Sequence, residues 1–153
     1  MSRYTRLMVE YRYPRPAFTA DIVALTSVDD VRHVLLIRRG NEPFAGRWAL
    51  PGGFADEGER PEDAARRELA EETGLCFSGA LELIGVYGDP GRDPRGWTVS
   101  AAYLALFDDR AGVVGGDDAV EARWFPFDAL PSLAFDHGCI VADAVALGFE
   151  HHE

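Results

Sequence analysis

The chain has 153 residues, a formal net charge of −11 and an apolar fraction of 47%. This length suits one globular domain with its own core, and the acidic balance argues against a general nucleic-acid binder, which needs a basic patch. The apolar runs are too short to span a membrane, and the polar first residues carry no signal-peptide pattern. We therefore expect one cytoplasmic domain over residues 1–153.

Strand and helix patterns follow one another along the chain. Residues 1–16 are polar and aromatic and are interpreted as an arm, an edge strand or part of a dimer contact. Apolar and β-branched patterns predict strands over residues 17–28, 31–38, 48–50, 80–87, 98–107 and 121–125, the first two as a hairpin. A helical turn is expected over 127–130 and a final helix over 135–149. This order favours an α/β (α+β) fold whose mixed sheet is covered on both faces.

A short helix between these strands carries the clearest chemical signal. Pro61 suits the first helical position, and Gly74 suits a left-handed cap at the end. Glu68, Glu71 and Glu72 have the spacing i, i+3 and i+4, so they share one helical face. Three carboxylates in that arrangement repel one another and suit a hard cation such as Mg²⁺. A solvated acidic helix is the simpler reading, but the tight clustering and the glycine-rich entry to the helix favour a metal.

Residues 53–75 resemble the Nudix box, G-x5-E-x7-R-E-U-x-E-E-x-G-U, in which U is aliphatic. All nine fixed positions match: Gly53, Glu59, Arg67, Glu68, Leu69, Glu71, Glu72, Gly74 and Leu75. The resemblance implies an α/β/α sandwich, with a core at about 17–149, and a Mg²⁺- or Mn²⁺-dependent hydrolase of nucleoside diphosphates linked to another moiety. It implies metal binding by Glu68, Glu71, Glu72 and the Gly53 carbonyl, and a structural ion pair between Glu59 and Arg67.

Three further segments resemble the ADP-ribose pyrophosphatase branch of this family: residues 38–48, 92–96 and 133–137. This implies hydrolysis of ADP-ribose to AMP and ribose 5-phosphate by a metal-activated water, with a small nucleotide as the only partner besides a second copy in a homodimer. One alternative is a nucleoside triphosphate pyrophosphatase of the 8-oxo-dGTP type. Another is a regulator that senses ADP-ribose without cleaving it. Such regulators usually have a degraded box and a C-terminal DNA-binding domain, for which we expect no room here.

Phosphate binding needs local positive charge, which arginine supplies in bidentate form. The arginines that flank the predicted site are Arg38, Arg39, Arg47, Arg92 and Arg95. Each of them is weighed evenly against ordinary surface charge.

Several other polar residues are candidates with more than one reading. His137 either places the substrate or caps the final helix. By resemblance, Glu121 is a further metal ligand or the general base, and Asp117 and Asp118 compete with it. The catalytic candidates are therefore Glu68, Glu71, Glu72 and Glu121. Cys76 and Cys139 match no metal-ligand spacing, and we expect them to be buried thiols in a reducing cytosol.

Overall fold

The computed structural model describes residues 10–150, with the backbone alone for residues 149 and 150. Its strands are β1 (Ala17–Val28), β2 (Val31–Arg39), β3 (Trp48–Ala49), β4 (Gly52–Phe54), β5 (Glu82–Tyr87), β6 (Thr98–Leu106) and β7 (Ala119–Pro126). They form one sheet in the order β3-β2-β1-β6-β5, with β4 paired to β1 and β7 paired to β2. Because β1 and β6 are parallel and the other strand pairs are antiparallel, the sheet is mixed, as predicted.

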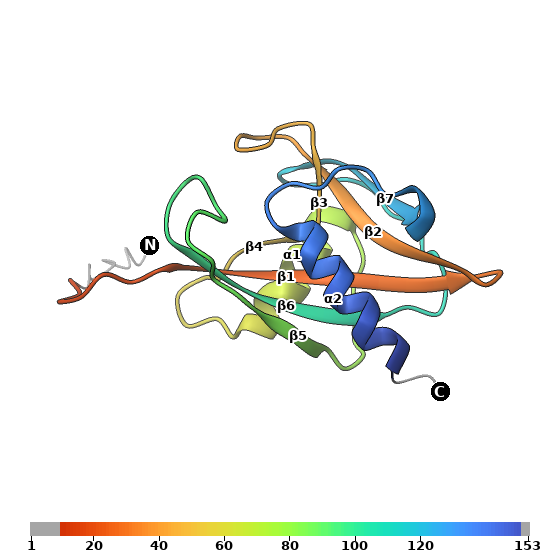
Figure 1. Cartoon of the computed structure of the whole chain (residues 1–153), viewed down its shortest axis with the longest axis horizontal. Coiled ribbons are helices and arrows are strands. Elements are labelled where there is room, and N and C mark those ends of the chain that lie inside the picture. The colour runs from red at the N-terminus through yellow and green to blue at the C-terminus, as the bar shows by residue number, and fades with distance from the viewer. Residues whose placement is uncertain (1–9, 151–153) are drawn as a thin grey trace, which may run out of the picture.

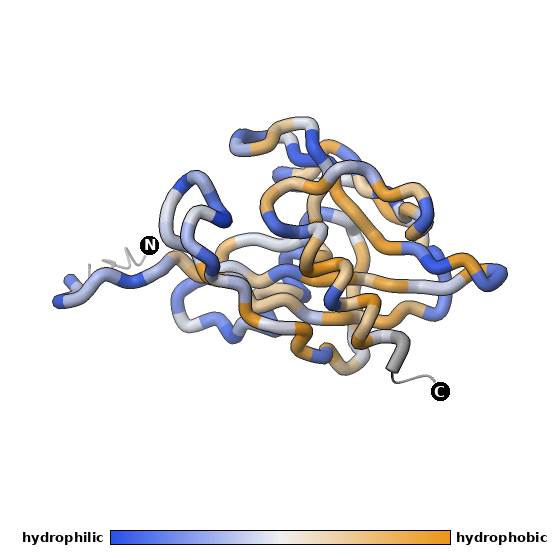
Figure 2. The backbone as a smooth tube through the Cα atoms, viewed as in Figure 1, coloured by the Kyte–Doolittle hydropathy of each residue, from blue (hydrophilic) through white to orange (hydrophobic). Residues whose placement is uncertain are grey.

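Two helices cover the two faces of this sheet, α1 (Pro61–Thr73) on one and α2 (His137–Glu150) on the other (Figure 1). Successive side chains of a strand point to opposite faces. In β1, Ile22 therefore packs in the core that contains Leu69 of α1, whereas Val23 packs in the core that contains Ile140 of α2. Figure 2 shows hydrophobic stretches in the strands and in α2, and hydrophilic ones in the peripheral loops. The predicted sandwich is confirmed.

On the edge that faces away from β6, the first strand changes its partner halfway along its length. Residues Leu25 to Val28 pair with β2, whereas Thr19 to Asp21 pair with β4. Between these two stretches, the Ile22 amide donates to the Pro51 carbonyl at 2.9 Å. The chain that leads into α1 therefore runs against β1 itself, and this contact brings the box residues to the middle of the sheet.

The element boundaries differ from the sequence predictions at a few places. The short strand β4 was not predicted, and β5 begins two residues late at Glu82. The last helix begins at His137 and not at residue 135, because Phe135 has a φ of +53°, which is outside helical geometry. The expectation of buried thiols is wrong, since Cys76 and Cys139 are both exposed.

The arm predicted at the N-terminus falls only partly within the structure. Residues 1–9 lie outside the described residues, and residues 10–16 form neither helix nor strand before β1. Within residues 10–150, no helix is both long enough and apolar enough to cross a bilayer.

Candidate active site

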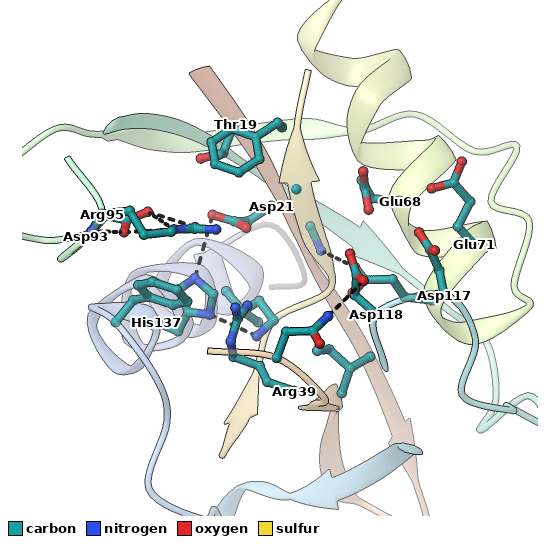
Figure 3. A pocket seen from close by; sticks show the side chains of 18 of the residues that line it. Thr19, Asp21, Arg39, Glu68, Glu71, Asp93, Arg95, Asp117, Asp118 and His137 are labelled. Carbon is teal, nitrogen blue, oxygen red and sulfur yellow. Dashed lines mark hydrogen bonds and ion pairs between the residues drawn. The ribbon is translucent and has the colours of Figure 1, made fainter. Parts of the chain in front are cut away.

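A pocket of about 350 Å³ opens where β1, β2 and β4 meet the carboxylate face of α1. Its remaining walls include the loop after β2, the loop after β5, the loop before β7 and the start of α2. Figure 3 shows the two sides of this pocket: Glu68, Glu71, Asp117 and Asp118 lie together on one side, and Asp93, Arg95 and His137 on the other. The pocket thus joins an acidic wall to a wall that carries arginines.

Local sequence signals set the ends of α1, the helix that carries most of the acidic wall. Pro61 occupies the first turn of α1, and Gly74 ends the helix with a φ of +78°, so the predicted start and stop are confirmed. One stripe of the helix, which includes Leu69 and Thr73, is buried against the sheet. The neighbouring face therefore turns Glu68, Glu71 and Glu72 toward the pocket, which all three line.

Arg67 is the centre of an ion-pair network at the rim. Its Nε and Nη2 donate to the two carboxylate oxygens of Glu59 at 2.8 and 2.9 Å, and its Nη1 donates to Glu68 at 2.8 Å and to Glu71 at 3.2 Å. The hydrogen bonds from Arg67 lower the pKa of Glu59 to about 2. Arg67 also donates to the Phe54 carbonyl at 3.1 Å. One guanidinium thus joins the loop, β4 and two carboxylates of the acidic wall.

Glu72 is the most buried carboxylate of that wall. It is 4% exposed, and its Oε1 accepts the Gly52 amide at 2.8 Å. Burial raises the pKa of Glu72 to about 8 and also raises the pKa of Glu68. A Cβ at Gly53 would lie 2.7 Å from the Glu68 carboxylate, so the backbone passes close to that carboxylate here, and a larger residue would displace the Glu68 side chain.

The donor set of this wall fits a hard divalent cation. Carboxylates of three α1 residues and of Asp117 and Asp118 line one side of a single pocket, and oxygen ligands of this kind suit Mg²⁺ or Mn²⁺. Among residues 10–150, no three acidic, histidine or cysteine side chains are already gathered tightly enough to hold an ion. Two of these carboxylates, Glu68 and Glu71, are hydrogen-bonded to the Arg67 guanidinium at 2.8 and 3.2 Å.

Three of the five candidate arginines line the pocket, namely Arg39, Arg92 and Arg95. Arg92 is bound through two nitrogens to Asp136, at 2.7 and 2.9 Å. Arg95 is bound in the same way to Asp93, with Nη2 at 2.8 Å from Oδ2. Arg39 donates its Nε to the Pro43 carbonyl at 2.7 Å. Strand alternation and the loop after β5 therefore bring cations of separate segments into one site.

The structure does not bring Arg38, Arg47 and Glu121 to the pocket lining. Arg38 and Glu121 are cross-strand neighbours of β2 and β7, and they pair with each other at 3.5 Å. Because Arg39 points into the pocket, its neighbour Arg38 points to the opposite face of the strand. Glu121 also accepts Arg123 at 2.7 Å, and the Arg47 guanidinium lies 5.5 Å from the Phe44 ring.

His137 lies at the buried end of the pocket and starts α2. Its Nδ1 accepts the Leu50 amide at 3.0 Å, and its Nε2 is 3.8 Å from Oδ2 of Asp21. Burial lowers the pKa of His137, which favours the neutral ring. Asp21 is also buried and accepts the Ser100 hydroxyl at 2.5 Å. These contacts join β1, β6, α2 and the residue that follows β3 beneath the site.

Sequence reasoning missed several lining residues, including Asp21, Asp93, Phe54 and Phe135. Asp21 offered a signal, since it is a lone charge inside an apolar strand. Asp93 stood in a loop noted for its arginines, but no pattern separated it from the other acidic residues. The aromatic pair offered no signal, because aromatic residues more often pack in a core.

The chain matches known proteins over most of its length. A family model described as the NUDIX domain matches residues 17–144. The ADP-ribose pyrophosphatase of Methanocaldococcus jannaschii is 41% identical over 149 residues, which cover 92% of this chain and 84% of that protein. The ADPR responsive transcriptional repressor NtrR of Acinetobacter baylyi is 39% identical over 139 residues, and they cover 88% of this chain but 55% of the repressor.

A solved structure shares both the fold and part of the sequence. The NUDIX domain of Shewanella oneidensis NrtR, crystallised with ADP ribose, superposes with a TM-score of 0.81 at 35% identity, covering 88% of this chain and 90% of that one. The box, its ion pair and the carboxylate face of α1 thus occur in a matching fold. Since the family model spans most of the chain, this protein belongs to the Nudix family of hydrolases.

Proposed function

We propose that this protein hydrolyses ADP-ribose to AMP and ribose 5-phosphate. The observation that carries the proposal is a single pocket in which the carboxylates of α1 face arginines from β2 and the loop after β5. A diphosphate with an organic group on each side needs cations along its length, and it needs room for both groups. The proposal is further supported by the 41% identity to an archaeal ADP-ribose pyrophosphatase.

The acidic wall is proposed to hold Mg²⁺ or Mn²⁺ through Glu68, Glu71, Glu72 and the Gly53 carbonyl. When bound, such ions neutralise the diphosphate and lower the pKa of a bound water. The remaining work falls to residues of the chain. Arg67 and Glu59 hold the loop and helix in register, because their two hydrogen bonds join the residues before α1 to its middle turn.

The substrate is proposed to lie between this wall and the arginines. In the reaction, the oxygen of water bonds to one phosphorus, and the bond from that phosphorus to the bridging oxygen breaks. The second phosphate leaves with the bridging oxygen, and the proton of the water passes to a carboxylate of the pocket. Asp117 and Asp118 are better placed for this than Glu121, because both line the pocket and Glu121 does not. His137 supports the floor through the Leu50 amide.

The wider setting is part of the same proposal. One Nudix domain would span residues 1–153, with its core at about 17–149, and work in the cytoplasm as a homodimer. A charge of −11 is consistent with a small nucleotide as partner in place of nucleic acid.

Two other functions use the same fold. A nucleoside triphosphate pyrophosphatase would need the same carboxylates and differ in its loops. A regulator would bind ADP-ribose and leave it intact, and a repressor that responds to this ligand is among the relatives. This chain spans only 55% of that repressor, and it retains every fixed position of the box.

Incubation of the purified protein with ADP-ribose and Mg²⁺, followed by chromatography, separates the enzyme from the regulator. Hydrolysis predicts equal amounts of AMP and ribose 5-phosphate over many turnovers. Tight binding of ADP-ribose without product would favour the regulator and overturn the proposal.

A further inference from the structure

The loop of residues 88–96, between β5 and β6, carries two arginines with different partners. The Arg92 side chain is only 5% exposed, and two of its nitrogens bond the two carboxylate oxygens of Asp136. This pair ties the loop to the residue that precedes α2. Because the Arg92 side chain is almost fully buried in this pair, we assign it the role of holding the loop against the start of α2.

Asp93, by contrast, is a buried carboxylate that pairs with one exposed neighbour, Arg95. Its side chain is 2% exposed, whereas the Arg95 side chain is 42% exposed. The Asp93 carboxylate accepts the Arg95 amide at 2.9 Å, its Nε at 3.1 Å and its Nη2 at 2.8 Å. Burial alone would raise the pKa of Asp93, but these hydrogen bonds lower it overall. A buried carboxylate is costly unless it is paired, and here the pairing fixes one guanidinium in one orientation.

That orientation places Arg95 between aromatic rings and near a second cation. The Arg95 guanidinium carbon lies 4.9 Å from the centre of the Phe54 ring and 5.8 Å from that of Phe135. The Arg39 guanidinium carbon lies 5.0 Å from the same Phe135 ring. Phe135 is held in turn by the edge of Phe44, with ring centres 4.8 Å apart. The pKa of Arg39 is lowered by burial and also by the charge of Arg95.

Both cations retain free donors that can reach the pocket. Nε is the only Arg39 nitrogen with a hydrogen bond, and Nη1 of Arg95 has none, among the described residues. Both side chains line the same pocket. Two like charges brought close together, each with unpaired N–H groups, form a site for an anion with several oxygens, because such an anion removes the repulsion and accepts the free donors.

We propose that Asp93 is a positioning residue that holds Arg95 beside Arg39, and that these two arginines clamp phosphate oxygens of the substrate. Arg92 takes no part in this anion clamp and anchors the loop to α2. The identity of the anion as the diphosphate of ADP-ribose rests on the function proposed above. The clamp itself rests on the Asp93 hydrogen bonds and on the free donors of Arg39 and Arg95.

The decisive experiment is a double-mutant cycle on steady-state hydrolysis of ADP-ribose with Mg²⁺. Asp93→Asn keeps the shape of the side chain and removes its charge, so we expect KM to rise about ten-fold and kcat to stay within about two-fold. Arg95→Ala should raise KM at least as much. Adding Asp93→Asn to Arg95→Ala should then change KM no further, because Asp93 acts only through Arg95.

Other results of the cycle would overturn the proposal. An unchanged KM in Asp93→Asn, a fall in kcat alone, or an equal rise of KM in the Arg95→Ala background would each do so. Glu62→Gln is the matched control, since it removes a carboxylate bonded to an exposed arginine, Arg60, away from the pocket, and it should leave KM unchanged. If Asp93→Asn does not fold, Arg95→Lys replaces it: KM close to that of Arg95→Ala supports the clamp, and wild-type KM refutes it.

A binding measurement separates the clamp from the proposed reaction. Inorganic pyrophosphate is titrated into the wild-type protein, and the Nε–H signal of Arg95 is followed by NMR. The clamp predicts a saturable shift of this signal in the wild type, and pyrophosphate binding, measured by calorimetry for both proteins, at least about five-fold weaker in Arg95→Lys than in the wild type. No shift in the wild type would overturn the clamp. If ADP-ribose is not hydrolysed but this shift occurs, the proposed function fails and the clamp stands.

Discussion

Glu72→Gln should stabilise the metal-free protein while removing most of its turnover. Burial raises the pKa of Glu72 from 4.5 to about 8 in the folded protein. Between these two values the folded state binds more protons than the unfolded state, so stability falls as pH rises. The interval from the unfolded pKa of 4.5 to pH 7 is 2.5 pH units. At 1.36 kcal/mol per pH unit, the ionisation of buried Glu72 therefore lowers the free energy of unfolding at pH 7 by about 3 kcal/mol. Glutamine stays neutral and keeps an oxygen for the Gly52 amide, so it escapes this loss.

Thermal unfolding in EDTA, followed from pH 4 to pH 8, measures the effect. The wild type should lose stability as the pH rises across this range. The Tm of Glu72→Gln minus that of the wild type should be larger at pH 7 than at pH 4 by roughly 6–12 °C. Glu71→Gln is the control, because its side chain is 41% exposed and we expect no comparable gain. A wild-type stability that does not change with pH would refute the burial argument. Near-normal turnover of Glu72→Gln with Mg²⁺ would refute its metal-binding role.

Two further predictions concern the acidic wall and its rim. Removal of divalent ions with EDTA should reduce AMP release from ADP-ribose to background, and added Mg²⁺ should restore it; full activity in EDTA would exclude the metal. The Glu59 carboxylate should remain ionised at pH 3, because its pKa is about 2 beside Arg67, and the stability of this pair should be lost only as pH falls from about 4.5 through 2. NMR of the Glu59 carboxyl carbon tests this, and a midpoint near 4.5 in the wild type would contradict it.

The elements that sequence predicted best are those with local signals. The helix Pro61–Thr73 has a proline at its start and a glycine at its cap, and the strand Ala17–Val28 has a long apolar pattern that the structure reproduces. The strand Gly52–Phe54 has neither. It contains two glycines, and it is a strand because Thr19 to Asp21 provide a partner, which is a tertiary effect that no short window of sequence contains.

The candidate site divides in the same way. The carboxylates of α1 follow from helical spacing, and the resemblance to a known box supplied the Glu59–Arg67 pair, whose geometry the structure contains. Which of Arg38 and Arg39 faces the pocket depends on the register between β2 and β7. The role of Asp93 depends on burial and on hydrogen bonds within a loop. These are properties of packing, and residue type alone could not reveal them.

The central claim is that ADP-ribose is the preferred substrate. The most direct measurement is a competition in which the protein acts on equal concentrations of ADP-ribose and 8-oxo-dGTP with Mg²⁺, because the ratio of initial rates equals the ratio of the two kcat/KM values. We predict that AMP and ribose 5-phosphate form at least about ten times faster than 8-oxo-dGMP. Faster formation of 8-oxo-dGMP would contradict the account and would assign the same acidic wall to a triphosphate pyrophosphatase.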